Sequence, residues 1–409
     1  MSEALQIGEL EPPPAEIERP KHRARLALLK RLADVISLPL SRVNSFERSV
    51  TADLLVEILR DADFDERARI ARRIATLAEI PNCLIRLILR DDLDIAYPLL
   101  LDSTALSDAD LLDCARNSTG AHRRLIAQRR GVSEVLAEAL VEFGETLVVE
   151  ALLRNEQARL SPTAVELVVA MTQHQGQLVP MLLRRPELRP NHAYVLFWWA
   201  DADARRVILQ RFAVSREVLQ EAAGDVFPMA AAEGWQDGLT RKALQFIERR
   251  QRNRAAIEKS PYDSLEAAIH AAEEGLSREI AEEIAYLAGI KPMTGAKIMG
   301  DPGGEGLAVL CKATGLPRAA LRQLWRALRR AEVGEDGEPS PALTHVISIY
   351  DMIAVDRAQT VLRYWNWSLS SAMTPALIKA IREEDNAALD EFSVPQRSAM
   401  LAFGSELKR

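Results

Sequence analysis

Residues 132–161 read VSEVLAEALVEFGETLVVEALLRNEQARLS, and this stretch decides the fold. It contains two short segments, Ser133 to Phe143 and Glu145 to Asn155, separated by Gly144. Apolar residues recur every three or four positions in each segment, which is the period of a helix buried on one face. A glycine between two such segments favours a tight turn. The stretch therefore predicts a helical hairpin.

Helix-start signals recur on both sides of this hairpin, at intervals of 24 to 30 residues. Ser and Asn are favoured before the first turn of a helix, and Pro is favoured inside it. The signals are Asn82 after Pro81, Ser107, Ser133, Ser161 before Pro162, Asn191 after Pro190, and Ser215. Each interval has room for two short helices, so the pattern predicts a tandem array of hairpins.

A longer self-similarity supports the array. Residues 80–107 can be laid on residues 132–161 so that Leu101 falls on Leu153, which lies 52 positions later. A fixed period of this kind is typical of a solenoid, in which each unit buries its apolar face against its neighbours. We therefore expect an all-α protein with a HEAT-like α-solenoid of short helical hairpins over residues 23–224.

The two ends of the chain differ from this array. The opening EPPPAEIERP at 11–20 is rich in proline, so residues 1–22 are expected to be a disordered tail. Beyond Gly224 the spacing weakens, and a basic helix is expected at 239–259. We predict a C-terminal helical domain over 225–409, with an acidic linker near 333–341 that could also be a long inter-helix loop.

Composition limits the class of protein. The chain is 48% apolar and 27% charged, and its net charge of −7 disfavours a dedicated nucleic-acid binder. Neither a secretion signal nor a membrane-spanning run is found, so we expect a cytoplasmic protein without a membrane segment. The widely spaced Cys83, Cys114 and Cys311 are expected to be buried, reduced thiols. No metal and no cofactor is expected.

Two stretches resemble a known family. LLLDSTALSDADLLDCARNSTGAHRRLIAQRRGVSEVLAEALVEFGETLVVEALLRNEQARLS at 99–161 is similar to an uncharacterised domain family, common in alphaproteobacteria and catalogued as a domain of unknown function. DPGGEGLAVLCKATGLP at 301–317 resembles the C-terminal hallmark of that family. The resemblance covers roughly residues 50–330. It implies a HEAT-like helical repeat and brings no activity, catalytic residue or cofactor.

The hallmark contains a glycine-rich loop, GDPGGEG at 300–306. Glycine loops before helices can hold phosphate, but a P-loop needs Lys and then Ser or Thr after its last glycine, and here Leu307 and Ala308 follow. We interpret the segment as a tight turn between two helices, with Asp301 or Glu305 capping the second. An anion or nucleotide site is the alternative.

A basic cluster in AHRRLIAQRR is the first candidate site for a partner. It contains His122, Arg123, Arg124, Arg129 and Arg130. A solvated hairpin corner is the simpler interpretation, and a docking site for an acidic protein partner or a phosphate is the alternative. Arg69, Arg72 and Arg73 lie about one unit earlier, which suggests one basic stripe. The arginines could instead form structural bridges to the acids Asp91, Asp92, Asp94 and Glu145 in neighbouring helices.

An aromatic run, Phe197, Trp198 and Trp199, is the second candidate site, with Asp201, Asp203, Arg205 and Arg206 just after it. Three consecutive aromatic residues cannot share one helix face, so at least one must pack in the core. The exposed remainder could form a protein-binding hot spot or a base-contacting site. The stripe of Arg318, Arg322 and Arg326 is either a solvated face or a contact for an acidic partner.

No combination of a nucleophile with a base, and no cofactor fingerprint, points to catalysis. We therefore expect a protein-interaction scaffold or regulatory adaptor that uses a helical-repeat surface. The alternative is a HEAT-like nucleic-acid-binding protein or DNA-repair-type enzyme. The oligomeric state is left open.

Overall fold

The structure is a computed structural model that describes residues 20–39, 41–215, 218–219, 254–334 and 337–371. Within these ranges every named element is a helix and no strand is formed. Val333 and Pro339 form an isolated antiparallel bridge inside the predicted acidic linker. The prediction of an all-α protein is confirmed.

The chain divides into two compact units, which we describe separately. The first comprises residues up to 140 together with 157–159, and the second comprises residues 141–156 and those from 160 onward. The helices of the first unit are α1 (Pro20–Ile36), α2 (Ser45–Arg60), α3 (Phe64–Ile74), α4 (Asn82–Leu89), α5 (Leu93–Asp102), α6 (Asp108–Asn117) and α7 (Gly120–Gln128). Helix α8 (Glu134–Glu142) crosses the division between the units.

Capping explains why several of these helices begin where they do. Ser107 precedes α6, and its hydroxyl accepts a hydrogen bond from the N–H of Asp110, whose carboxylate accepts one in return from the N–H of Ser107. The same reciprocal pair precedes α2, formed by Asn44 and Glu47. Such a reciprocal pair, called a capping box, supplies acceptors for two of the N–H groups that have no partner within the helix at its start.

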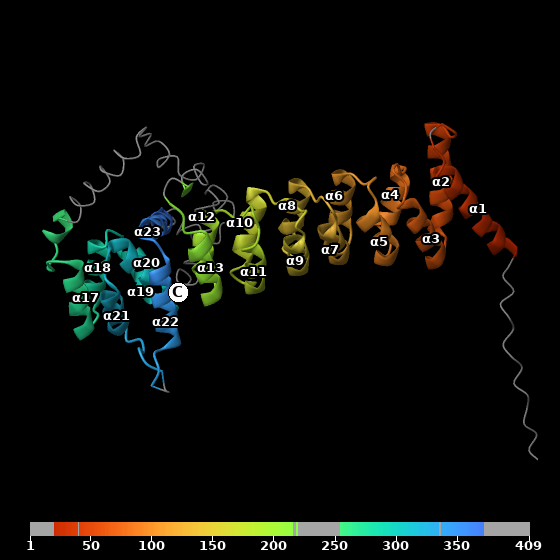
Figure 1. The fold of residues 1–409 in the computed structure, drawn as a ribbon. Helices are drawn as coiled ribbons and strands as arrows, with labels where there is room; N and C mark the ends of the chain where they lie inside the picture. The colour runs from red at the N-terminus through yellow and green to blue at the C-terminus, as the bar shows by residue number, and fades with distance from the viewer. Residues whose placement is uncertain (1–19, 40, 216–217, 220–253, 335–336, 372–409) are drawn as a thin grey trace, which may run out of the picture. The chain divides into compact units, whose positions relative to one another are not determined.

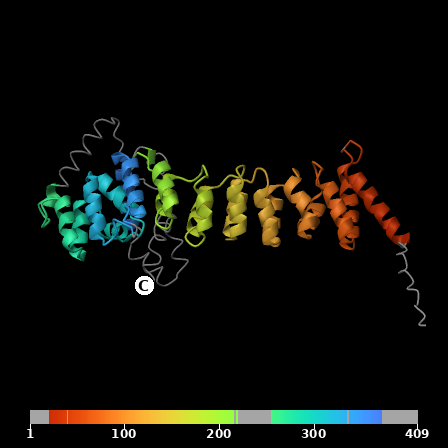
Figure 2. The ribbon, with the colours of Figure 1, turned by 60° about the horizontal axis from the view of Figure 1, so that its bottom comes forward.

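The helices of the first unit pack in two layers (Figure 1). One layer is formed by α1, α3, α5 and α7, in which each helix contacts the next, and the other is formed by α2, α4 and α6. Contacts between α1 and α2, α4 and α5, and α6 and α7 join the layers. The turned view in Figure 2 shows the same succession of neighbouring helices. Each helix therefore buries its apolar side between the layers.

The second unit contains the remaining helices. They are α9 (Thr146–Arg154), α10 (Pro162–Met171), η1 (Gly176–Leu178), α11 (Val179–Leu182), α12 (Pro190–Leu196), α13 (Ala202–Arg211), α17 (Leu265–Glu274), α18 (Arg278–Leu287), α19 (Pro292–Gly300), α20 (Glu305–Thr314), α21 (Arg318–Ala327), α22 (Pro341–Met352) and α23 (Val355–Ser371). Helix α20 is buried on every side from Glu305 to Cys311 and packs against α19, α21, α22 and α23. A helix that is apolar all round belongs in a core, which explains the sequence GLAVLC.

Some sequence-based boundaries differ from the structure. Helix α1 begins at Pro20, inside the tail predicted for 1–22, while residues 1–19 lie outside the described residues. Asn191 is not a cap, because Pro190 occupies the first turn of α12 and Arg189 precedes it. The predicted domain boundary at 224 and most of the basic helix at 239–259 lie outside the described residues. Among the helices that are described, none is both long and apolar enough to cross a membrane.

Candidate interaction sites

The basic cluster around α7 separates into buried and exposed residues. Arg129 is only 9% exposed, and its guanidinium donates to the carbonyl oxygens of Leu99, Leu100 and Ser103, the last at 2.8 Å. These carbonyls lie at the end of α5, where the last C=O groups of a helix lack partners within it. Arg129, the residue that follows α7, therefore caps the end of α5.

Arg123 and His122 also serve the packing of this unit. Nη1 of Arg123 donates to the carbonyl oxygens of Ala115 and Ser118, at 2.8 and 2.9 Å, and so caps the end of α6. The His122 ring is buried, with Nε2 at 3.2 Å from the carbonyl oxygen of Asp91 and Nδ1 at 2.9 Å from the hydroxyl of Thr119. The carbonyl can only accept, so Nε2 is the donor in this contact.

The exposed members are Arg124 and Arg130. Arg124 lies on α7, and the predicted companions Arg69 and Arg72 are exposed on α3, which belongs to the same layer. Arg73 instead forms an ion pair with Asp34, and Arg67 pairs with Asp91 at 2.9 Å. Asp91 is one of the acids predicted to form bridges, but its partner Arg67 belongs to neither predicted cluster, and Asp34 is not among the predicted acids.

Between α3 and α7 lies α5, which presents Asp94 and Tyr97. Ile95, Ala96, Leu99 and Leu100 of α5 are fully buried, so Tyr97, 47% exposed, points away from the core. Helix α5 is flanked by α3 and α7 and contacts α4 of the other layer, which leaves its outer side exposed. We call this outer side the arginine–tyrosine face; it consists of Asp65, Arg69 and Arg72 of α3, Asp94 and Tyr97 of α5, and Arg124 of α7.

The aromatic run lies largely in the core of the second unit. Phe197 is fully buried and Trp198 is 8% exposed, and both pack against Trp365 of α23, with ring centroids 4.7 and 4.8 Å apart. Nε1 of Trp365 donates to the carbonyl oxygen of Tyr194 at 3.0 Å. Trp199 is partly exposed and donates from Nε1 to the hydroxyl of Thr172 at 2.9 Å. Little of Trp198 is left for a partner to contact.

The glycine-rich loop is a turn between α19 and α20. Gly304 has a φ of +83°, and its N–H donates to Oδ2 of Asp301 at 3.1 Å. The guanidinium of Arg330 stacks on the Trp325 ring and donates to the carbonyl oxygens of Met299, Asp301 and Pro302. Burial lowers the pKa of Arg330, while the nearby carboxylates of Asp301 and Glu305 oppose that shift.

Two carboxylates of this loop lie in a buried ion cluster, which we define as Arg205, Asp301, Glu305 and His345. Nη1 of Arg205 donates to Asp301 at 2.7 Å and to Glu305 at 3.0 Å, and all three side chains are less than 10% exposed. On the other side, Nε2 of His345 lies 3.3 Å from Oε1 of Glu305. A phosphate placed at this loop would face two buried carboxylates, which makes the turn a poor anion site.

Two arginines of the α21 stripe have acidic neighbours within the chain. Arg318 forms an ion pair with Asp351, and Arg326 pairs with Glu273 at 2.6 Å and with Glu332 at 3.2 Å. Arg322 is exposed. No group of His, Cys, Asp or Glu side chains that could hold a metal ion occurs in the described ranges.

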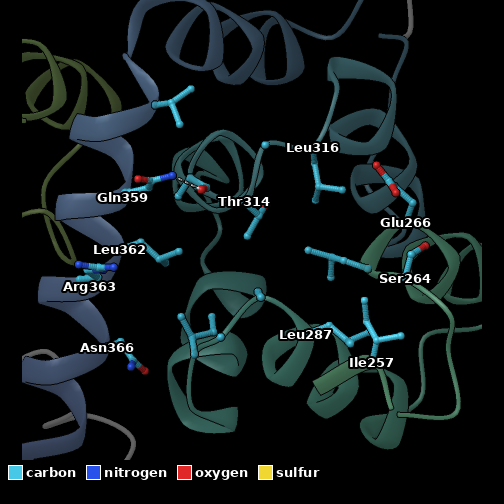
Figure 3. Close-up of a pocket in the computed structure, with 17 residues that line it drawn as sticks. Ile257, Ser264, Glu266, Leu287, Thr314, Leu316, Gln359, Leu362, Arg363 and Asn366 are labelled. Atoms are coloured by element: carbon cyan, nitrogen blue, oxygen red, sulfur yellow. Dashed lines mark hydrogen bonds between the residues drawn. The ribbon is translucent and has the colours of Figure 1, made fainter. Parts of the chain in front are cut away.

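A groove that the sequence did not indicate lies within the second unit (Figure 3). It has a volume of about 460 Å³ and is bounded by α23, by the start of α17 and by the turns that end α18 and α20. We call it the helix-end groove. Figure 3 shows Gln359, Leu362, Arg363 and Asn366 along α23 on one side and Ser264 and Glu266 on the other. The only available signal was the similarity between LAGIKP at 287–292 and ATGLP at 313–317, which marks two equivalent helix ends.

The comparison with known proteins places the chain in a family. The model described as "Uncharacterised protein conserved in bacteria (DUF2336)" matches residues 95–363. The chain belongs to this family. No curated protein and no solved structure matches the chain. The DUF2336 match covers α7, the aromatic run, the buried ion cluster and most of the helix-end groove, whereas Arg69 and Arg72 of the arginine–tyrosine face lie before it.

Proposed function

We propose that this DUF2336 protein is a cytoplasmic interaction scaffold or regulatory adaptor built on a HEAT-like helical repeat. Two observations support the repeat. Residues 80–107 can be laid on residues 132–161 with Leu101 on Leu153, 52 positions later. In the first unit, helices two apart in chain order contact each other, as α3 and α5 do. In such an array, successive helical repeats offer one continuous surface to a partner.

The observation that carries the proposal is the arginine–tyrosine face. Tyr and Arg are the residue types most often found at the energetic centre of protein interfaces, together with Trp. Here the three exposed arginines lie on α3 and α7, on either side of the helix that carries Tyr97, and Asp65 and Asp94 are the acids among them. The face has a net positive charge, so the partner that fits it is an acidic protein segment with an apolar side chain to cover Tyr97.

Nucleic acid is a less suitable ligand for the same face. Asp94 would repel phosphate, and the chain carries a net charge of −7. Trp198 and Arg205, which a DNA-repair-type enzyme would use at an open surface, are buried. These facts favour a protein partner over the alternative of a nucleic-acid-binding protein or DNA-repair-type enzyme.

The test is cross-linking in native cells followed by purification of the tagged protein. We expect one set of acidic partners to be retained by the wild type and lost with the double variant Arg69→Glu, Arg124→Glu. Arg116→Glu, at an exposed arginine of α6 in the other layer of the same unit, is the matched control and should keep them. If the double variant and the control variant retain the same partners, the face is not the docking site. Salt-dependent binding of duplex DNA that the double variant loses would instead support the nucleic-acid alternative.

A further inference from the structure

The helix-end groove exists because two helices stop in the same way. The N–H of Ile290 donates to the carbonyl oxygen of Ala285 at 3.0 Å, and the N–H of Leu316 donates to that of Cys311 at 2.9 Å. Each bond joins residues five positions apart, as in the Schellman motif that ends many helices. The glycine before each donor, Gly289 or Gly315, has a left-handed backbone. Pro292 and Pro317 follow. Helices α18 and α20 therefore both end at the groove.

The glycines at these two ends are uncovered. Gly289 and Gly315 have φ values of +74° and +81°, and a Cβ built on either would meet no heavy atom within 4 Å among the described residues. Gly295 is covered, since a Cβ there would lie 2.5 Å from the side chain of Ala285, whereas Gly275 and Gly300 are as open as the two helix ends. The backbone at the two helix ends is thus open to close approach by another molecule.

The floor of the groove is aliphatic. Leu287, Ile290, Leu316 and Leu362 are each less than 10% exposed and line it, and no aromatic side chain is among its lining residues. The wall formed by α23 runs from Val355 to Asn366, which corresponds to about 16 Å of helix. The groove therefore offers an aliphatic floor beside about 16 Å of helix.

The two long walls carry opposite charges. Glu266 is exposed on the α17 side, and Arg363 is exposed on the α23 side next to the amides of Gln359 and Asn366. The carbonyl ends of α18 and α20 add partial negative charge between them. An occupant complementary to this pattern needs an aliphatic stripe with a basic residue along one edge and an acidic residue along the other.

We propose that the helix-end groove binds an amphipathic helix of a partner protein through Leu, Ile or Val anchors spaced i, i+3 or i+4, and i+7. Three such anchors extend over about 10 Å of helix axis, which fits the 16 Å wall. The basic edge of the bound helix faces Glu266 and its acidic edge faces Arg363. This site is independent of the arginine–tyrosine face, since all its lining residues lie in the second unit.

A groove that runs beside about 16 Å of helix suits a helix better than a compact small molecule. Small-ligand sites enclose most of their ligand's surface. Here Ile257 and Val355 at the rim are 39% and 45% exposed, so a compact ligand would leave them in water. A helix lying along α23 covers both rims at once.

The experiment selects a phage-displayed library of 16-residue peptides against the full-length protein and measures the selected peptide by fluorescence anisotropy. We expect enriched sequences with the aliphatic spacing given above. Ile257→Asp and Val355→Asp should each raise the Kd about tenfold or more, because a carboxylate would replace an apolar contact. Val207→Asp is the matched control: Val207 is 40% exposed on α13, outside the groove, and its variant should leave the Kd within about twofold.

A charge swap provides a second readout that does not depend on the rim variants. Glu266→Lys should weaken binding of the selected peptide. A peptide in which Glu replaces the basic residue should bind that variant again. Arg124→Glu should have no effect, which separates this site from the first unit. Equal affinity for all variants, or selected peptides without the aliphatic spacing, would refute the proposal. A full-length dimer that Val355→Asp converts to a monomer in light scattering would identify a second copy as the occupant and overturn it as well.

Discussion

Nη1 of Arg205 lies 2.7 Å from Oδ2 of Asp301, which comes 96 residues later in the chain. The same nitrogen lies 3.0 Å from Glu305, while Nε donates to the carbonyl oxygen of Ala200 at 2.9 Å. One guanidinium thus joins α13 to the glycine-rich turn before α20. The hallmark glycines allow this arrangement, since a Cβ on Gly303 would lie 2.1 Å from Oε2 of Glu305.

The first prediction concerns this ion pair. Arg205→Met removes the cation and leaves two buried carboxylates without it, so the free energy of unfolding should fall by about 3–5 kcal/mol. Urea denaturation followed by circular dichroism measures the loss. Arg206→Met, at the exposed neighbouring position, should change stability by no more than about 0.5 kcal/mol. Similar values for the two variants would show that the buried ion cluster does not stabilise the second unit.

The second prediction compares two glycines with nearly the same backbone. Gly304 and Gly315 have φ values of +83° and +81°, so alanine at either costs about 1–2 kcal/mol in backbone strain. At Gly304 the new Cβ would also lie 2.6 Å from the Trp325 ring and 2.7 Å from Nη1 of Arg330, whereas at Gly315 it meets nothing. Thermal melts should therefore show a clearly larger loss for Gly304→Ala. An equal loss would mean that the ring and the guanidinium move aside without cost.

The sequence was sufficient for the local structure. Apolar periods and helix-start residues predict an all-α protein, and of those residues Ser107 and Ser161 do cap helices, whereas Asn82 and Asn191 lie inside the first turn. The glycine-rich segment was interpreted as a turn between helices, and Gly304 lies in one with a left-handed backbone. These features depend on neighbours a few residues apart, which a single sequence displays directly.

The sequence was not sufficient for contacts between distant residues. Arg205 and Asp301 were both noted, but no pattern within either segment links residues 96 positions apart. Trp198 likewise packs against Trp365, which lies 167 positions later and is not indicated by any pattern around the aromatic run. Tyr97 was missed because a single exposed aromatic residue in an apolar helix leaves no periodic signal. Arg123 and Arg129 appeared equivalent to Arg124 and Arg130, because capping of a distant helix end depends on packing.

The third prediction concerns the thiols. Burial raises the pKa of Cys311 to about 12, and burial also raises the pKa of Cys114 and, with help from Asp53, that of Cys83. Only the thiolate reacts, so raised pKa values slow labelling at pH 8. Cys83 is half-buried, in contrast to the expected full burial, whereas Cys114 and Cys311 are buried. A thiol reagent should therefore label Cys83 first.

Mass spectrometry of the labelled peptides gives the order. Raising the pH from 7 to 9 should speed the labelling of Cys83 while Cys311 stays unreacted, because that range lies below its pKa of about 12. Both buried thiols should react together with global unfolding in urea. Labelling of Cys311 in the native protein at the same rate as Cys83 would contradict its burial in α20.

The last prediction separates capping arginines from docking arginines in the basic cluster. Arg129→Met removes the charged donor from the buried carbonyl oxygens at the end of α5. The free energy of unfolding, measured by urea denaturation, should therefore fall by about 1–3 kcal/mol. Arg124→Glu and Arg130→Glu lie at exposed positions and should stay within about 0.5 kcal/mol of the wild type. If Arg124→Glu also weakens capture of the acidic partner, its role is docking, because a change in binding without a change in stability cannot come from a lost structural bridge. If it instead lowers stability as much as Arg129→Met, Arg124 belongs to the packing of the layer, and the arginine–tyrosine face loses the residue that defines its α7 edge.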